Sequence, residues 1–455
     1  LFTRGALVDL VLRPDADRLF DFQVLTGILI SNGPGSISAQ GAKGAVSADG
    51  PETPERVQAK ALEYPGQVFH LRREQGGEGK AHTINHGLRI ITSEGWYEAV
   101  MIIDADVILT PPSLRRMTRY FAREEVGAVT AYIKEGSRPG NSMNRFVAFE
   151  YVTAQAAARR AQNVLGAQAC LAGGAQLIRR QSLEAIGGVV DTSTLAEDTV
   201  TTFNIQLAGK KVIYDPHAIV WAEEPRDIGG LWKQRVRWSR GNVQVTGHFR
   251  HIWLRRSRGS LGGVSFAFIW FTIFLMPALM VLATIGLLGL FFLNRDASID
   301  IFSALWFLTL ATYLFVTLSS FSIDPPTARR AWIEGAMFPG LVSLAIMLYA
   351  AYPPLFEQVL AGWLDRFGLK PGYDVMTGVL LFVYSWPAGC MVAAWLLKQL
   401  DRSPLKPLAL PGLFVVGYGP LLCAITTAGY IKELRGAEMK WEKTEKTGHI
   451  GTGTL

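Results

Sequence analysis

Long apolar stretches in the second half of the chain constrain its fold more strongly than any other feature of the sequence. A helix needs about 20 mostly apolar residues to cross the hydrocarbon core of a bilayer. Five stretches approach or exceed that length, and they are residues 261–293, 301–321, 335–352, 376–397 and 408–431. We expect four or five of them to cross a membrane, which predicts a helical transmembrane domain over residues 261–431.

Basic residues between these stretches predict which of their ends face the cytoplasm, because loops rich in lysine and arginine stay on that side. The connections concerned carry Arg329, Arg330, Lys398, Arg402 and Lys406. Five spans would place the basic polar tail, residues 432–455, on the side opposite to a cytoplasmic N-terminal domain. An even number would return the tail to the cytoplasm, and it requires that one stretch be re-entrant or form a hairpin.

Three segments near the apolar stretches are expected to meet the membrane interface. The first stretch is overlong and contains Pro277, which predicts a kink or an initial interfacial turn. Residues 354–367 alternate apolar and polar side chains at helical spacing and predict an interfacial helix. The basic segment 226–260 mixes tryptophans with arginines, which favours the cytoplasmic membrane face over the alternative of a solvated charged helix.

The first 260 residues have the mixed composition of a soluble α/β protein. The chain of 455 residues carries a formal net charge of +7, and its cations gather beside the apolar stretches. Anionic lipid headgroups and a nucleotide diphosphate are therefore the expected partners, and no nucleic acid is expected. The three cysteines have no metal-ligand spacing and predict no disulfide framework.

Two aspartates follow an apolar run, residues 99–103, that predicts a buried strand. Side chains at positions i and i+2 of a strand project to the same side, so Asp104 and Asp106 could serve a divalent cation and a diphosphate together. For such a pair taken alone, the alternative is a solvated strand end or a turn.

Two further polar motifs follow in the chain. Glu197 and Asp198 precede a helical pattern that Gly209 closes, so Asp198 taken alone reads as a helix N-cap. Gln234, Arg237 and Trp238 taken alone read as a basic helix face. The order of all three motifs, directly ahead of apolar stretches, favours a membrane-embedded sugar transferase over these separate alternatives.

A glycine-rich loop, residues 76–80, follows a predicted strand at 68–71 and precedes a helix in which Ala81, Ile84 and Leu88 share a face with Ile91. The loop does not match the phosphate-binding P-loop pattern, because Glu74 replaces its first glycine and Ala81 its hydroxyl residue. It still places Lys80 at a helix N-terminus, where an anion is favoured. The alternative is a flexible turn with a surface lysine.

Together these motifs resemble glycosyltransferase family 2. The resemblance rests on residues 79–87, the Asp104–Asp106 pair, residues 172–175, the Glu197-Asp198 pair and residues 230–238. Within that family the chain is similar to membrane-embedded processive polysaccharide synthases, the relatives of cellulose, hyaluronan, chitin and poly-N-acetylglucosamine synthases. The resemblance implies an α/β nucleotide-sugar transferase domain of the GT-A type, followed by an α-helical transmembrane domain.

The resemblance also implies a division of the chain. The cytoplasmic GT-A domain is expected over residues 46–225, the basic interfacial segment over 226–260, the transmembrane domain over 261–431 and the tail over 432–455. Residues 1–45 stay unassigned, and we expect a truncated N-terminus. The usual Asp-Asp-Gly-Ser element is reduced to Asp49-Gly50-Pro51 after Ala48.

Residue roles follow from the resemblance. It implies that Asp106 binds Mg²⁺ or Mn²⁺, that Asp198 is the catalytic base and that Glu197 acts beside it. It further implies that Arg237 faces the diphosphate and Trp238 stacks on the acceptor sugar. The substrate-binding set that it implies comprises Asp49, Lys80, Asp104, Gly173, Gly174, Gln234, Arg237 and Trp238.

The implied activity is that of an inverting hexosyltransferase. It would move a sugar from a UDP-sugar to the end of a growing polysaccharide at the cytoplasmic face of a bacterial inner membrane. Export of the polymer, with an accessory export subunit as a further partner, would be coupled to synthesis. The alternatives are transfer of a single sugar to a lipid phosphate carrier and a truncated, inactive membrane homologue.

Overall fold

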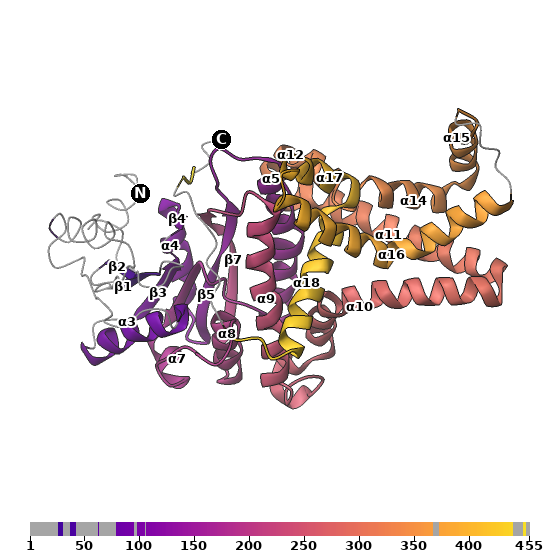
Figure 1. Cartoon of the computed structure of the whole chain (residues 1–455). Helices are drawn as coiled ribbons and strands as arrows, with labels where there is room; N and C mark the ends of the chain where they lie inside the picture. The colour runs from indigo at the N-terminus through magenta and orange to yellow at the C-terminus, as the bar shows by residue number, and fades with distance from the viewer. Residues whose placement is uncertain are drawn as a thin grey trace.

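The structure is a computed structural model that describes residues 26–30, 37–41, 62, 79–94, 98–104, 106–366, 373–439 and 449–451. An α/β part built around one sheet is followed by a helical part that extends away from it (Figure 1). The order that the sequence predicts, α/β domain first and helical domain second, is confirmed. The predicted strand at 68–71, Asp49 and the loop before Gly79 lie outside the described residues.

The described sheet has seven strands in the order β2-β1-β3-β6-β5-β7-β4. Their bounds are β1 Thr26–Ile30, β2 Ile37–Gly41, β3 Ala99–Asp104, β4 Val107–Leu109, β5 Val126–Glu135, β6 Ala175–Arg179 and β7 Lys211–Ala222. The pairs β1–β3 and β5–β7 are parallel, and the other neighbours are antiparallel. The sheet is therefore mixed, as is common in α/β domains whose sheet carries helices.

Alternate residues of the central strand β3 enter two different cores. Val100 and Ile102 pack with Ala81, Ile84 and Leu88 of helix α3 (Lys80–Glu94). The intervening Met101 and Ile103 pack on the opposite face with Met117 of helix α4 (Pro111–Thr118). Period-two alternation in a strand buried on both faces produces this result. Each such side chain contributes about 1.5–3 kcal/mol when fully buried.

The sheet bends so that its far edge returns to the end of β3. Strands β3 and β4 are nearly consecutive in the chain, yet three strands separate them in the sheet. The β5–β7 pairing shifts register between Ala131 and Tyr132, and an irregularity of this kind bends a strand pair. The Asp106 carbonyl accepts a hydrogen bond from Glu223 N at 3.2 Å, directly after β7. Asp104 thus ends β3, as the sequence predicts, whereas Asp106 lies in the turn between β3 and β4 and not on the same strand.

The other helices of the α/β part and its junction are α5 Ser142–Glu150, α6 Ala157–Leu165, α7 Arg180–Ala185, α8 Glu197–Leu207 and α9 Ile228–His248, with a π-helical turn at Tyr151–Ala156. Short 3-10 turns span Arg119–Ala122, Arg256–Gly262 and Lys406–Leu408. Helix α9 lies between the sheet and the helical part (Figure 1). The Asp227 side chain caps α9 by accepting a hydrogen bond from Gly230 N at 2.7 Å.

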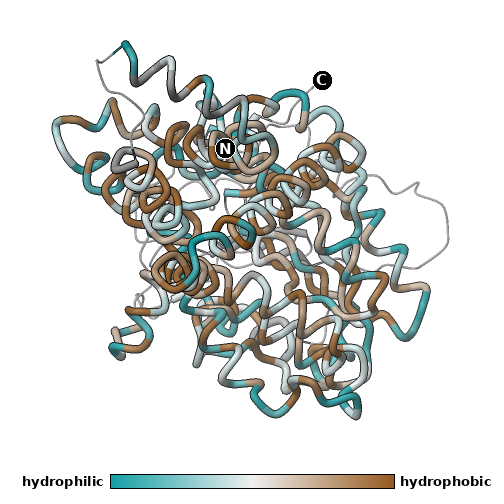
Figure 2. The backbone as a smooth tube through the Cα atoms, turned by 90° about the vertical axis from the view of Figure 1, so that its right-hand side faces the viewer, coloured by the Kyte–Doolittle hydropathy of each residue, from teal (hydrophilic) through white to brown (hydrophobic). Residues whose placement is uncertain are grey.

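The helical part comprises α10 Val264–Leu293, α11 Arg295–Ile323, α12 Pro325–Arg330, α13 Trp332–Ala336, α14 Leu341–Ala351, α15 Pro353–Arg366, α16 Tyr373–Asp401, α17 Ala409–Val416 and α18 Tyr418–Leu434. Apolar residues recur along these helices in the view from the helical end (Figure 2). Among the described residues, Phe274–Leu293, Arg295–Ile323 and Met376–Asp401 are long and apolar enough to cross a membrane. The bent pair Lys406–Val416 and Tyr418–Leu434, with 105° between its halves, brings the number to at most four.

The stretch 335–352 differs from the other predicted spans. It contains a helix break before α14, and α14 has 11 residues. At 1.5 Å per residue that helix is about 16 Å long, roughly half of the hydrocarbon thickness. The break lies at Gly340, whose φ of +86° suits glycine, and a Cβ there would lie 2.5 Å from the nitrogen of Gly417 at the second break. The two breaks therefore pack against each other, which a hydropathy pattern does not reveal.

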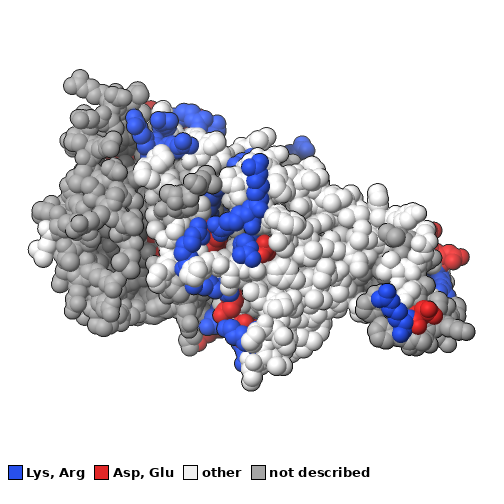
Figure 3. Space-filling view, turned by 90° about the horizontal axis from the view of Figure 1, so that it is seen from above, with Lys and Arg blue, Asp and Glu red and all other residues white. Residues whose placement is uncertain are grey.

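The chain after α18 returns to the α/β part. Arg240 of α9 forms an ion pair with Glu433 at 2.8 Å, and Ser137 pairs with Ile450 as an antiparallel bridge. Charged residues gather over the boundary between the two parts, while the helical surface beyond it is mostly uncharged until its far end (Figure 3). If the long helices cross a membrane, residues 264–434 must cross it an even number of times.

Candidate active site

Lys80 lies at the centre of a buried group of charges. Its ammonium nitrogen is 2.6 Å from Asp104 Oδ1 and 3.7 Å from Glu197 Oε1. The same nitrogen donates a hydrogen bond to the carbonyl of Gly173 at 3.0 Å. Lys80, Asp104 and Glu197 are all buried. The alternative of a surface lysine is therefore wrong, and Lys80 joins two motifs that are 93 residues apart in the chain (Asp104 and Glu197).

Two glycines allow this close approach. A Cβ at Gly173 would lie 3.0 Å from Asp198 Oδ2 and 3.1 Å from the Lys80 ammonium. A Cβ at Gly174 would lie 3.2 Å from Val107 Cγ2, beside the aspartate pair. A side chain at either position would push on a group of the site. The two predicted glycines thus lie in the candidate site, where the absence of a side chain lets the charged groups approach the backbone.

The pair Glu197 and Asp198 lies in the first turn of α8. The N-cap position belongs to Ala196, which makes no side-chain cap, so the N-cap interpretation of Asp198 is wrong. Asp198 Oδ1 instead accepts a hydrogen bond from Thr199 N at 2.7 Å. Negative charge in the first turn of a helix is favoured by the helix dipole.

The charges of the site shift one another's proton affinities. Burial raises the pKa of Asp104 to about 6 and the pKa of Glu197 to about 7, although nearby Lys80 acts in the opposite direction. Burial lowers the pKa of Arg237, and the carboxylates of Glu197 and Asp104 oppose that change. Asp198 and Asp106 add to this opposing effect on Arg237. Helix α9 therefore brings the Arg237 guanidinium toward all four carboxylates.

The remaining motif residues on α9 have different surroundings. Gln234 Nε2 donates a hydrogen bond to Glu224 Oε2 at 3.1 Å, so this side chain is held within the protein. Trp238 is the exposed member of the motif, with 37% of its surface accessible. Arg235, between them, lies over the Trp238 ring with its guanidinium carbon 3.8 Å from the ring centroid.

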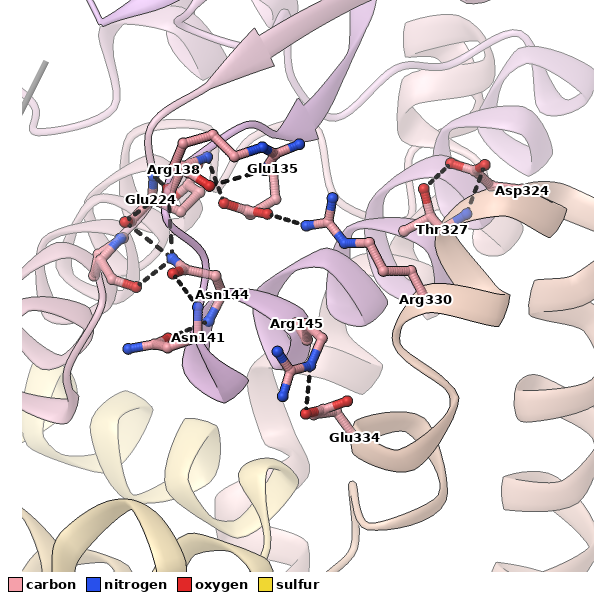
Figure 4. Close-up of polar contacts among 12 residues, drawn as sticks. Glu135, Arg138, Asn141, Asn144, Arg145, Glu224, Asp324, Thr327, Arg330 and Glu334 are labelled. Atoms are coloured by element: carbon pink, nitrogen blue, oxygen red, sulfur yellow. Dashed lines mark hydrogen bonds and ion pairs between the residues drawn. The ribbon is translucent and has the colours of Figure 1, made fainter. Parts of the chain in front are cut away.

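Charge pairs fasten the site-bearing domain to the helical part, beside Glu224 (Figure 4). Arg330 of α12 pairs with Glu135 at 2.7 Å, and Arg145 of α5 pairs with Glu334 at 2.7 Å. Asn144 donates a hydrogen bond to the Glu224 carbonyl at 3.3 Å. These contacts limit the movement of the site relative to the first helices that follow it.

The carboxylates of the site suit a divalent cation that also binds a substrate. The described residues contain no group of three or more His, Cys, Asp or Glu side chains that could hold a metal ion. Mg²⁺ is commonly bound through one or two carboxylates and the phosphates of the substrate. Asp104 is paired with Lys80, and the half-buried Asp106 is the other carboxylate of the pair. This donor set fits a metal that arrives with a diphosphate.

Three residues near the site escaped the sequence interpretation, namely Glu150, Glu224 and Arg235. Glu224 had a detectable signal, because it follows the apolar strand β7 just as Asp104 ends β3. Glu150 lies on helix α5 among apolar residues and gave no signal. Arg235 was assigned to a basic face, and its burial became evident only from the packing.

Comparisons with known proteins indicate the family of the α/β part. Residues 46–241 match the family model described as "Glycosyltransferase like family 2". A poly-beta-1,6-N-acetyl-D-glucosamine synthase of Staphylococcus epidermidis (strain RP62A) is 28% identical over 252 residues, which cover 54% of this chain and 58% of that protein. The synthase of Staphylococcus aureus (strain COL) is 30% identical over 172 residues, 38% of this chain and 40% of that protein. The matched segments thus cover 58% and 40% of the lengths of these two relatives.

Two solved structures match the chain at low similarity. A mannosyltransferase from Pyrobaculum calidifontis, in complex with GDP-Man and Mn²⁺, matches with a TM-score of 0.39 and 17% identity over 79% of this chain and 78% of that one. GalNAc-T7 with UDP, GalNAc and Mn²⁺ matches with a TM-score of 0.30 and 14% identity over 40% of this chain and 37% of that one.

Proposed function

Residues 46–241 are a glycosyltransferase family 2 domain, and on that premise we propose that the chain is an inverting hexosyltransferase that elongates a polysaccharide. The donor is a UDP-sugar, and the acceptor is the end of the growing polymer. The reaction takes place at the cytoplasmic face of a bacterial inner membrane, and export of the product follows synthesis. The convergence of Lys80, Asp104, Glu197, Asp198 and Arg237 on one buried place carries this proposal.

The chemistry assigns a role to each group. An acceptor hydroxyl oxygen attacks the anomeric carbon of the donor, and the bond from that carbon to the diphosphate breaks. The hydroxyl proton passes to Asp198, and UDP leaves with the bonding electrons. Attack from the face opposite to the leaving group inverts the anomeric centre. A carboxylate base within hydrogen-bond reach is what such a proton transfer requires.

Charge that develops on the diphosphate is the main electrostatic demand of the reaction. Arg237 supplies a guanidinium that can donate two parallel hydrogen bonds to phosphate oxygens. A divalent cation held by Asp106 would supply Lewis-acid stabilisation of the same oxygens. Lys80 holds Asp104 and Glu197 in place and limits the repulsion among the four carboxylates. Burial strengthens all of these interactions, because the local dielectric constant is low.

The polymer part of the proposal is supported by Trp238 and by the relatives. Sugar rings present apolar C–H faces that pack on an indole, and Trp238 is partly exposed beside Arg237 on α9. The first relatives are named as synthases of poly-beta-1,6-N-acetyl-D-glucosamine. UDP-N-acetylglucosamine is therefore the first donor to test. The helices after the site would provide the route by which product leaves.

The test combines product analysis with one substitution. Purified membranes are supplied with a panel of radiolabelled UDP-sugars and Mg²⁺ or Mn²⁺, and product size is measured beside UDP release. Wild-type protein should make a polymer from one donor. Trp238→Ala should shorten the product and slow elongation by a factor that corresponds to about 1 kcal/mol or more, while UDP release falls less. A wild-type product with one sugar on a lipid would overturn the polymer proposal.

A further inference from the structure

We propose that Arg235 is a positioning residue that fixes one face of the Trp238 indole, and that Glu150 of α5, itself bonded to Tyr418 of α18, holds Arg235 in place. The proposal rests on the proposed function, because it assigns the acceptor sugar to the opposite face of the indole. Positions i and i+3 of a helix are neighbours, so Arg235 and Trp238 share one side of α9. The guanidinium carbon lies 3.8 Å from the indole centroid, which is stacking distance.

The hydrogen bonds of Arg235 show that stacking decides its orientation. A guanidinium that serves only as an ion-pair partner usually binds a carboxylate with two parallel hydrogen bonds. Here Nη2 alone bonds to Glu150 Oε2, at 3.0 Å. The Arg235 atoms Nε and Nη1 are buried and make no hydrogen bond with any described residue. Leaving donors unpaired in a buried place is costly, so another contact must hold the plane of the group. That contact is with the indole of Trp238.

Glu150 connects this stack to the break between α17 and α18. The same Oε2 atom that accepts from Arg235 also accepts a hydrogen bond from the Tyr418 hydroxyl at 2.7 Å. Tyr418 is the first residue of α18, directly after the Gly417 break, and its ring stacks on Phe146 of α5 with 1° between the planes. The position of the break is thereby linked through Glu150 and Arg235 to the orientation of Trp238.

The stack has a consequence for the acceptor. An indole has two faces, and the Arg235 guanidinium lies over one of them. Trp238 nevertheless keeps 37% of its surface accessible, and we assign this accessible surface to the side that the guanidinium does not cover. The sugar ring of the acceptor therefore packs on the face away from Arg235. If the guanidinium is removed, the indole can turn and present either face.

Arg240 provides a matched control. It lies on the same helix, is as deeply buried as Arg235 at 6% exposure, and pairs with Glu433 of α18 at 2.8 Å. Arg240 is not among the cations that lie over the Trp238 ring. Lysine keeps the positive charge at either position but loses the flat guanidinium and its stacking. If the ion pairs of α9, Arg235–Glu150 and Arg240–Glu433, have a purely structural role, Arg235→Lys and Arg240→Lys should give the same result.

The first measurement needs no turnover. Hydroxyl-radical oxidation of the protein in lipid nanodiscs is followed by mass spectrometry of the peptide that contains Trp238. Arg235→Lys should increase the oxidation rate of Trp238 several-fold, because the covered face becomes accessible, whereas Arg240→Lys should leave it unchanged. An unchanged rate in Arg235→Lys, or an equal increase in Arg240→Lys, would overturn the proposal.

The second measurement separates acceptor binding from chemistry. With UDP-N-acetylglucosamine as donor and an N-acetylglucosamine oligosaccharide as acceptor, Arg235→Lys should raise the acceptor KM roughly tenfold, within the range for a desolvated cation–π contact. The donor KM should stay within about twofold of the wild-type value, because Arg235 does not contact the donor in this proposal. Tyr418→Phe should give a smaller rise of the acceptor KM, because it loses only the hydroxyl. Equal losses with donor and acceptor would assign Arg235 a structural role instead.

The two proposals can fail separately. If the wild-type protein transfers no sugar from any UDP-sugar, the proposed function fails, and the oxidation experiment still decides whether Arg235 covers the indole. If wild-type protein elongates the acceptor and Arg235→Lys has the wild-type acceptor KM, the positioning proposal fails and the proposed function stands.

Discussion

The α/β part and the helical part differ in the side chains that they expose. In β3, Val100 and Ile102 are fully buried, and the polar surface of the domain faces outward. In α11, Phe315 and Leu318 are 71% and 66% exposed, while Ser320 is fully buried. A soluble protein rarely exposes so many large apolar side chains along one helix. Because helices of the second part are long and apolar enough to cross a membrane, we propose that the two parts suit two solvents, water and lipid.

The same comparison explains where the charges lie. The α/β part contains a buried group of charges, with Lys80 among carboxylates, and such a group is stable only when its members are paired. The helical part has its ion pairs at the end next to the α/β part, as Arg330–Glu135 and Arg145–Glu334 show. Charge is thus concentrated where a nucleotide diphosphate and lipid headgroups would both lie.

The largest effect is expected at the aspartate pair. Asp106→Asn should abolish sugar transfer, because the amide is a poor ligand for the cation on the diphosphate. Expression and membrane insertion should stay normal, since the helical part is unchanged. Transfer assays with and without EDTA measure the effect. Asp191→Asn, in the loop before α8, is the control, and full activity of Asp106→Asn or of the EDTA-treated enzyme would contradict the metal assignment.

A smaller but still severe effect is expected at Asp198. Asp198→Asn should slow transfer by at least about 10²-fold, the usual contribution of a general base, while binding of the UDP-sugar persists. Calorimetry measures binding, and a separate assay measures transfer. Loss of both together would show that Asp198 supports the structure of α8 and does not accept the proton.

A pair of leucine substitutions tests the two-solvent comparison directly. Leu88→Ala, at a fully buried position of the α/β part, should lower the free energy of unfolding of that part by about 2–5 kcal/mol. Leu318→Ala, at an exposed position of α11, should change stability by less than about 0.5 kcal/mol. Thermal unfolding in detergent measures both. An equally large loss in Leu318→Ala would mean that this face of α11 packs against protein and not against lipid.

The smallest effect is expected in the pH dependence. The Lys80 ammonium lowers the pKa of Asp104 and the pKa of Glu197, so Lys80→Met should raise both. A carboxylate that must be ionised for activity becomes protonated as the pH falls through its pKa. A higher pKa moves this loss of activity to higher pH. The acid limb of kcat/KM should therefore shift upward by roughly 1–3 pH units. Lys80→Arg keeps the charge and should shift less, whereas a downward shift in Lys80→Met would contradict the arrangement.

Several parts of the site were predictable because the signal lay in short stretches of sequence. The run before Asp104 predicted β3, and the pattern of Ala81, Ile84 and Leu88 predicted the buried face of α3. Two other motifs are equally local. Glu197 and Asp198 are adjacent, and Gln234 lies about one helical turn before the adjacent Arg237 and Trp238. Local patterns of this kind depend on the period of a strand or a helix, which a sequence displays.

Other parts were not predictable because the contacts join distant segments. Gly340 and Gly417 both interrupt apolar stretches, and only the packing of one break against the other shows that neither stretch forms a simple straight helix. Asp106 lies in a turn after β3 because the next strand, β4, pairs with β7 at the other edge of a bent sheet. That the end of α18 lies beside α9 became evident from Arg240 and Glu433, which are 193 residues apart.

Sequence alone was sufficient for the class of the fold, the order of its two parts and the residue types of the site, because these depend on composition, periodicity and adjacent motifs. Tertiary structure was required to show that Lys80 neutralises carboxylates, that Asp198 is not a helix cap and that Arg235 covers the Trp238 indole. The physical reason is that burial and pairing of a charge depend on neighbours from other segments. A lysine or arginine has the same place in the sequence whether water or a carboxylate surrounds it.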